Sequence, residues 1–114
     1  MSPSKLLPLS PRDFILMLIL ADGPAHGYGI VKEAQEKFGN AVKLDPANLY
    51  RAILRLMRDG VVVDAADPPS DASEQRRHFE LTEFGQEVLA AEAERLATLT
   101  DAARSMALIP KRSG

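Results

Sequence analysis

The spacing of apolar residues changes twice along the chain, and this pattern limits the possible folds more than any other feature. Apolar residues recur at helical intervals up to about residue 60, at alternate positions over residues 61–81, and at helical intervals again afterwards. Because a two-stranded hairpin is not stable by itself, strands at 61–63 and 77–81 must pack against helices. The sequence therefore predicts a mainly α fold, in which three helices and a two-stranded β-hairpin precede a long fourth helix.

Two of the first three predicted helices have well-defined starts, and all three have stop signals. Ser10 can accept hydrogen bonds from the first amides, Pro11 suits the first helical position, and Asp13 occupies the capping-box position. Asp45 and Pro46 form a similar start for the third helix, and the second begins at about His26. Turn-forming residues then end the three helices, at Asp22-Gly23-Pro24, Gly39-Asn40 and Asp59-Gly60.

The first helix and the third helix differ in how their apolar residues are distributed. Residues 14–20 are apolar all the way round, so we expect the first helix in the core or in a dimer interface, with Phe14 and Leu18 at the interface. The third helix has one apolar stripe, formed by Leu49, Ile53, Leu56 and Met57. Its opposite side carries Asn48 and a row of arginines at i, i+4 and i+7, which are Arg51, Arg55 and Arg58.

The last predicted helix covers residues 83–108 and has a heptad-like seam. The seam residues are spaced by 7, 3, 4 and 3, as in a coiled coil, and are Leu89, Leu96, Leu99, Ala103 and Met106. A compact domain of this size offers this helix too little surface to bury such a stripe. We therefore expect residues 83–108 to be a dimerisation helix, between a domain at 10–82 and a short tail at 109–114, with a flexible tail at 1–9.

Composition and charge limit the classes of function that this chain can have. The net charge of −2 does not suggest a nucleic-acid-binding protein, but residues 1–60 carry eight Lys and Arg against six Asp and Glu. There is no cysteine and there are only two histidines, so neither an enzyme nor a cofactor or metal site is predicted. His78 reads as a surface histidine, and Glu92 and Glu94 as a solvated helix face. The longest apolar run, residues 14–21, is too short to cross a membrane, and we expect a cytoplasmic protein.

The predicted order of elements is that of a winged helix-turn-helix domain, whose third helix enters the DNA major groove. Arginines can bind phosphate or guanine, and an asparagine near the helix start can bind adenine. A solvated charged surface is the alternative. The expected DNA contacts are Tyr28, Lys43, Asn48, Tyr50, Arg51, Arg55, Arg76 and Arg77. Of these, Tyr28 and Tyr50 could instead pack, and Lys43 could be solvated, while the acidic loop at 66–74 is not expected to contact DNA.

Three segments give this pattern a family resemblance. These segments are residues 20–30, in which Gly-Pro is followed by His-Gly-Tyr, residues 48–60 and residues 77–85. Together they resemble the PadR family of winged-helix transcriptional regulators. The resemblance implies a dimeric repressor of the short branch, which has a single C-terminal helix, and a possible small aromatic or drug-like effector. Family members often have Thr and Pro where this chain has Asn48 and Arg51, and Tyr where it has Phe79.

The main hypothesis is a homodimeric repressor that reads an inverted-repeat operator in double-stranded DNA. Two further hypotheses stand beside it. The first is a winged-helix protein–protein interaction module without DNA binding, which the acidic net charge favours. The second adds an effector pocket between the first and last helices of the dimer.

Overall fold

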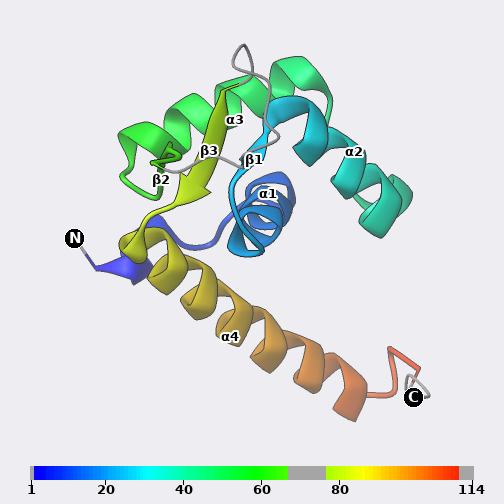
Figure 1. Ribbon diagram of the computed structural model, residues 1–114. Coiled ribbons are helices and arrows are strands. Elements are labelled where there is room, and N and C mark those ends of the chain that lie inside the picture. Colours follow the sequence, from blue (N-terminus) through cyan, green and yellow to red (C-terminus); the bar gives the residue numbers. More distant parts are fainter. Residues whose placement is uncertain (1, 67–76, 111–114) are drawn as a thin grey trace.

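The computed structural model describes residues 2–66 and 77–110, and its α-helices pack against a small sheet (Figure 1). In chain order the helical elements are η1 (Pro3–Leu6), α1 (Pro11–Ala21), α2 (Gly27–Phe38), η2 (Gly39–Ala41), α3 (Pro46–Arg58) and α4 (Glu83–Ser105). The strands are β1 (Ala25–His26), β2 (Val62–Asp64) and β3 (His78–Leu81). This order confirms the predicted mainly α fold. None of the helices in these ranges is both long and apolar enough to span a membrane.

Side-chain caps start each of the four α-helices. Ser10 Oγ accepts from the Asp13 amide at 3.1 Å and Asp45 Oδ1 accepts from the Asn48 amide at 2.9 Å, as the sequence predicted. His26 Nδ1 caps α2 by accepting from the Gly29 amide at 3.0 Å. The expected capping box at Asp13 was wrong, because its carboxylate instead accepts hydrogen bonds from a residue of α3.

The sheet has three antiparallel strands in the order β1-β3-β2, one more than the predicted hairpin. The additional strand, β1, places His26 opposite His78, and Val62 lies opposite Leu81 on the other side of β3. Pairing with β1 has a consequence for His78. Its ring packs edge-on against the ring of His26, with 5.1 Å between the ring centroids, and the His78 side chain is buried. The prediction of a surface histidine was therefore wrong.

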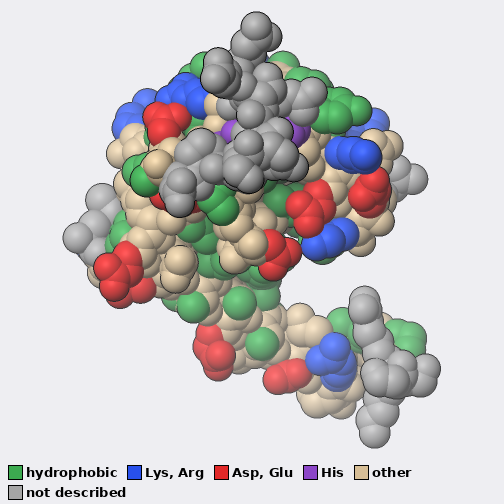
Figure 2. Space-filling model, in the orientation of Figure 1, with side chains coloured by type: hydrophobic (Ala, Val, Ile, Leu, Met, Phe, Trp, Pro, Cys, Tyr) green, Lys and Arg blue, Asp and Glu red, His purple; other side chains and the backbone are tan. Residues whose placement is uncertain are grey.

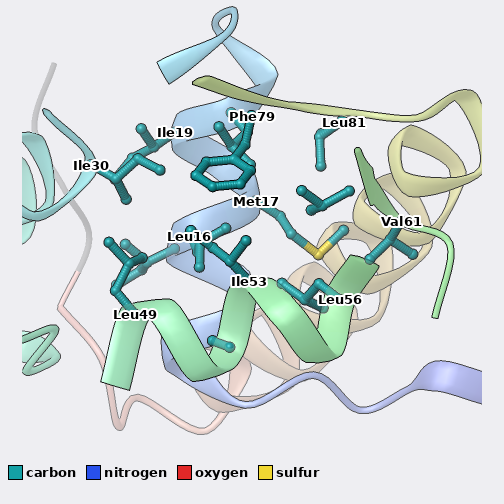
Figure 3. Close-up of a cluster of buried hydrophobic side chains, with 14 of the residues drawn as sticks. Leu16, Met17, Ile19, Ile30, Leu49, Ile53, Leu56, Val61, Phe79 and Leu81 are labelled. Atoms are coloured by element: carbon teal, nitrogen blue, oxygen red, sulfur yellow. The ribbon is translucent and has the colours of Figure 1, made fainter. Parts of the chain in front are cut away.

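The core lies between α1, α3 and the sheet. Figure 3 shows Leu16 and Met17 of α1 between the α3 residues Leu49, Ile53 and Leu56 and the β3 residues Phe79 and Leu81. Leu16 and Met17 have no exposed surface, which confirms that α1 is central. On α3, Ala52 is buried and Met57 only half-buried, so the apolar stripe is shifted slightly from its predicted position.

The segment before α1 is packed, unlike the flexible tail expected at 1–9. Within the described part of that segment, η1 packs against α4, and the Leu9 amide donates to Glu92 Oε2 at 2.7 Å. Glu92 is 0% exposed and also binds Arg95, so its assignment to a solvated face was wrong. A buried carboxylate requires such partners, because desolvating an unpaired charge is costly.

Candidate nucleic-acid interface

The outward face of α3 is the first part of the candidate interface. Its exposed residues are Ala47, Tyr50, Arg51, Leu54 and Arg58, which we call the α3 outer face. The opposite side of the helix is buried in the core through Leu49, Ile53 and Leu56. The Asp45 cap and Pro46 fix where the helix begins, and the apolar stripe fixes which side points outward.

The predicted row of three arginines is interrupted at Arg55. Its Nη2 donates to both carboxylate oxygens of Asp13, at 2.6 and 2.7 Å, and Asp13 is buried. Arg55 therefore joins α3 to the first turn of α1, while its side chain stays partly exposed beside Arg51. Within the described ranges, Arg51 and Arg58 form no ion pair, so the α3 outer face keeps two cations without a carboxylate partner.

Asn48 is held in a hydrogen-bonded chain at the start of α3. Its Nδ2 donates to Asp45 Oδ2 at 2.7 Å, and its Oδ1 accepts from Arg51 Nη2 at 2.7 Å. Both ends of the amide are thus occupied, whereas the sequence predicted that this amide would read adenine. In the observed arrangement Asn48 orients Arg51, and its amide keeps one further N–H donor and one further acceptor lone pair that a base could use.

Two exposed tyrosines border an apolar groove at the junction of α2, α3 and β3. Tyr28 is 69% exposed and Tyr50 52% exposed, and the groove between them has a volume of about 570 Å³. Leu49 and Phe79 are among the apolar residues that line it. Lys43 is exposed shortly before α3. These positions leave Tyr28, Tyr50 and Lys43 accessible to a partner of the α3 outer face.

Arg77 at the base of the hairpin is neutralised by its neighbours. Its Nη2 donates to Asp64 Oδ2 at 2.8 Å, its Nε also donates to this carboxylate, and the guanidinium lies 5.1 Å from the Phe79 ring centroid. The hydrogen bonds to Asp64 raise the pKa of Arg77 and lower the pKa of Asp64. Arg77 is therefore less available to phosphate than predicted. Arg76 and the acidic residues of the predicted 66–74 loop from Asp67 onward lie outside the described residues.

Two exposed residues near this surface were missed as candidate contacts. Leu54 lies on the α3 outer face, and Arg12 lines a polar groove of about 300 Å³ between α1 and α3, together with Ser10 and Arg51. The position of Leu54 opposite the apolar stripe was a usable sequence signal, whereas only the packing of α1 against α3 reveals Arg12. Figure 2 shows Lys and Arg side chains over the region of α3 and several acidic side chains along the α4 side.

The residues expected at a dimer interface differ in exposure. Leu99 is 54% and Met106 70% exposed, while Leu96 and Ala103 are half-buried. On α1, Phe14 and Leu18 are half-buried against the core. Leu89 is buried in the core of its own chain, so its assignment to the seam was wrong. The exposed part of the seam lies in the C-terminal half of α4, which projects beyond the rest of the chain (Figure 1).

One family model matches more than half of the chain. The model of the family described as "Transcriptional regulator PadR-like family" matches residues 15–91. An uncharacterized 37.1 kDa protein in transposon TN4556 of Streptomyces fradiae is 35% identical over 86 residues, which are 75% of this chain and 23% of that protein. The chain thus spans about a quarter of the length of this curated relative.

Solved structures with the same fold include three regulators of low sequence identity. A PadR-like transcriptional regulator from Bacillus cereus has a TM-score of 0.72 at 13% identity, covering 87% of this chain and 93% of its own. A transcriptional regulator from Clostridium thermocellum has a TM-score of 0.67 at 21% identity, covering 85% and 96%. Bacillus subtilis PadR in complex with operator DNA has a TM-score of 0.61 at 17% identity, covering 72% of this chain and 46% of its own.

Proposed function

The chain belongs to the PadR-like family of transcriptional regulators, and from this premise we propose that it is a homodimeric repressor that binds an inverted-repeat operator in double-stranded DNA. In the proposed complex, α3 of each subunit enters one of two successive major grooves, about 34 Å apart. The family consists of transcriptional regulators, not enzymes. We further propose that the protein acts in the cytoplasm.

The observation that carries the proposal is the α3 outer face. Arg51 and Arg58 lack a carboxylate partner in the described ranges, and the helix behind them is anchored in the core. A guanidinium can bind phosphate oxygens or the O6 and N7 acceptors of guanine through two parallel hydrogen bonds. Arg51 is already oriented by Asn48, which limits the conformational entropy that it loses on binding. The complex of Bacillus subtilis PadR with operator DNA supports the same use of this fold.

Contacts with the DNA backbone are proposed for residues around this face. Tyr28 and Tyr50 have exposed rings with hydroxyl groups that can donate to phosphate, and Lys43 and Arg12 are exposed cations near the ends of α3 and α1. These contacts would position α3 without carrying sequence information. Arg77 would contribute only if phosphate replaced Asp64 as its partner.

Dimerisation is proposed through the C-terminal half of α4. Leu96, Leu99, Ala103 and Met106 continue the helical stripe beyond the core, and two of them are more than half exposed. Burying such a stripe against a second copy removes apolar surface from water, which favours association. We also propose that a small effector binds in a pocket between α1 and α4 of the dimer. The packing of α1 against α4 and the half-buried side chains of Phe14 and Leu18 support this position.

Selection of bound duplexes from a random library tests the proposed function. The full chain is expected to enrich a motif with two symmetric half-sites, and its affinity should fall steeply with salt because bound counterions are released. The net charge of −2 favours the alternative of a protein–protein interaction module. That alternative predicts no enriched motif at any salt concentration. The effector is tested separately, by a thermal-shift screen of small aromatic compounds.

A further inference from the structure

Leu54 occupies the middle of the α3 outer face and has no assigned role. It is 45% exposed and lies three residues after Arg51 and four residues before Arg58, so all three side chains share one face of the helix. Single exposed leucines are common on protein surfaces. This leucine, however, lies between two cations that the proposed function directs to the bases and phosphates of DNA.

The chemistry of the major groove limits what Leu54 can contact favourably there. Guanine, adenine and cytosine present hydrogen-bond acceptors or donors at their major-groove edges, with only small C–H groups such as cytosine C5–H beside them, and a leucine would desolvate the polar groups without replacing their bonds. Thymine alone presents a methyl group, on C5, at this edge. An aliphatic side chain gains free energy by covering that methyl group.

We propose that Leu54 is a specificity-determining residue that contacts the C5-methyl of a thymine at one fixed position in each half-site. This inference rests on the proposed function and specifies the operator that it requires. Arg51 and Leu54 are separated by about 4.5 Å along the helix axis, and base pairs are spaced by about 3.4 Å. With α3 lying along the groove, we expect the thymine within about two base pairs of the guanine or phosphate that Arg51 binds.

Replacing thymine by uracil tests this contact, since it removes the C5-methyl and leaves every hydrogen-bonding group in place. A site is first selected with the full chain, and each of its thymines is then replaced singly by uracil. Fluorescence anisotropy at fixed salt gives the Kd of each duplex for the parent chain, for Leu54→Ala and for Val63→Ala. Val63 is an exposed aliphatic residue of β2 and serves as the matched control.

For the parent chain and Val63→Ala, one uracil position per half-site should weaken binding about fourfold, the effect of leaving one methyl group unburied. Leu54→Ala should bind the thymine and uracil duplexes equally well. A Leu54→Gln chain, used in a new selection, should lose the preference for thymine at that position.

Two results would overturn the inference, and they can be told apart. If Leu54→Ala responds to uracil as the parent chain does, Leu54 does not read thymine, although the proposed function stands. If the parent chain enriches no motif, the proposed function and this inference both fail. Circular dichroism of each variant ensures that a lost contact is not mistaken for an unfolded chain.

Discussion

Arg55 of α3 donates from one guanidinium nitrogen to both carboxylate oxygens of Asp13 in the first turn of α1, at 2.6 and 2.7 Å. This ion pair joins two residues that are 42 positions apart. Asp13 also supplies the amide that Ser10 caps, so the same turn of α1 is fixed from both sides. The orientation of α3 relative to α1 is therefore held by a charge-assisted contact in addition to the apolar core.

We expect Asp13 and Arg55 to be energetically coupled in folding. Asp13→Asn and Arg55→Gln should each lower the free energy of unfolding by about 1–2 kcal/mol, because each leaves the other group without its charged partner. The coupling energy from the double-mutant cycle should be about 1 kcal/mol, since the Arg55 side chain is partly exposed and screened by solvent. Urea denaturation followed by circular dichroism measures all four chains. Arg51→Gln, on the exposed side of α3, serves as the control and should change stability by less than about 0.5 kcal/mol.

Arg51 and Arg55 should contribute differently to DNA binding. Arg51→Gln should weaken binding to a selected operator by about tenfold or more, as expected for the loss of a guanine or phosphate contact, without changing the circular dichroism spectrum. Arg55→Gln should have a clearly smaller effect at a temperature where the variant is fully folded. Titrations at several salt concentrations distinguish the two kinds of contact that Arg51 could make, because only a lost phosphate contact reduces the salt slope by about one. Equal losses for the two variants would mean that Arg55 leaves Asp13 when DNA binds.

Glu92 should make folding stability depend on pH. The hydrogen bond from Arg95 lowers the pKa of Glu92 below its ordinary value of 4.5, and the Leu9 amide acts in the same direction. A carboxyl group with a lower pKa in the folded state stabilises the fold above pH 4.5, and this stabilisation is lost as the pH falls through the folded-state pKa.

The matched test compares Glu92→Gln with Glu94→Gln, which changes an exposed residue of the same helix. Glu92→Gln should be less stable than the parent chain by about 1–2 kcal/mol at neutral pH, and this difference should shrink below about pH 4. Urea unfolding at a series of pH values measures it. Glu94→Gln should follow the parent curve closely. A difference for Glu92→Gln that stays constant with pH would show that the charge of Glu92 does not contribute.

Gly85 should not tolerate a side chain, although it lies in the first turn of a helix. A Cβ atom at this position would lie 2.2 Å from the Val61 carbonyl oxygen, which is backbone and cannot easily move away. In an open helical position Gly→Ala gains up to about 1 kcal/mol, whereas here we expect a loss of about 2 kcal/mol. Thermal unfolding measures the change, with Gln86→Ala at the adjacent exposed position as the control. An unchanged or raised Tm for Gly85→Ala would contradict the close approach of α4 to Val61.

Leu99 should be required for the proposed dimer and not for the fold of the chain. Leu99→Glu places a charge in the exposed part of the seam and should yield a monomer with an unchanged helical spectrum. Ala97→Glu introduces the same charge at an exposed position on another side of α4 and should remain dimeric. Sedimentation velocity over a range of concentrations distinguishes the two species. A Leu99→Glu chain that sediments like the parent would contradict this interface.

Local signals in neighbouring residues were sufficient to predict much of this molecule. The caps at Ser10 and Asp45 and the stop at Gly60 depend on residues a few positions apart, and the structure confirms them. The apolar stripe of α3 is confirmed except at Met57, which is only half-buried. A helix start or an amphipathic face is determined by short-range hydrogen bonding and spacing, which a sequence displays directly.

Tertiary contacts alone decided which polar residues face solvent. Arg55 is paired with Asp13, 42 positions away in the sequence, and the buried Glu92 accepts a hydrogen bond from the Leu9 amide, 83 positions away. In the sequence, both Arg55 and Glu92 resemble ordinary surface residues of amphipathic helices. His78 is likewise buried because β1 pairs with β3. Whether a charged or polar side chain is buried depends on a distant partner that offsets its desolvation, and no local pattern specifies that partner.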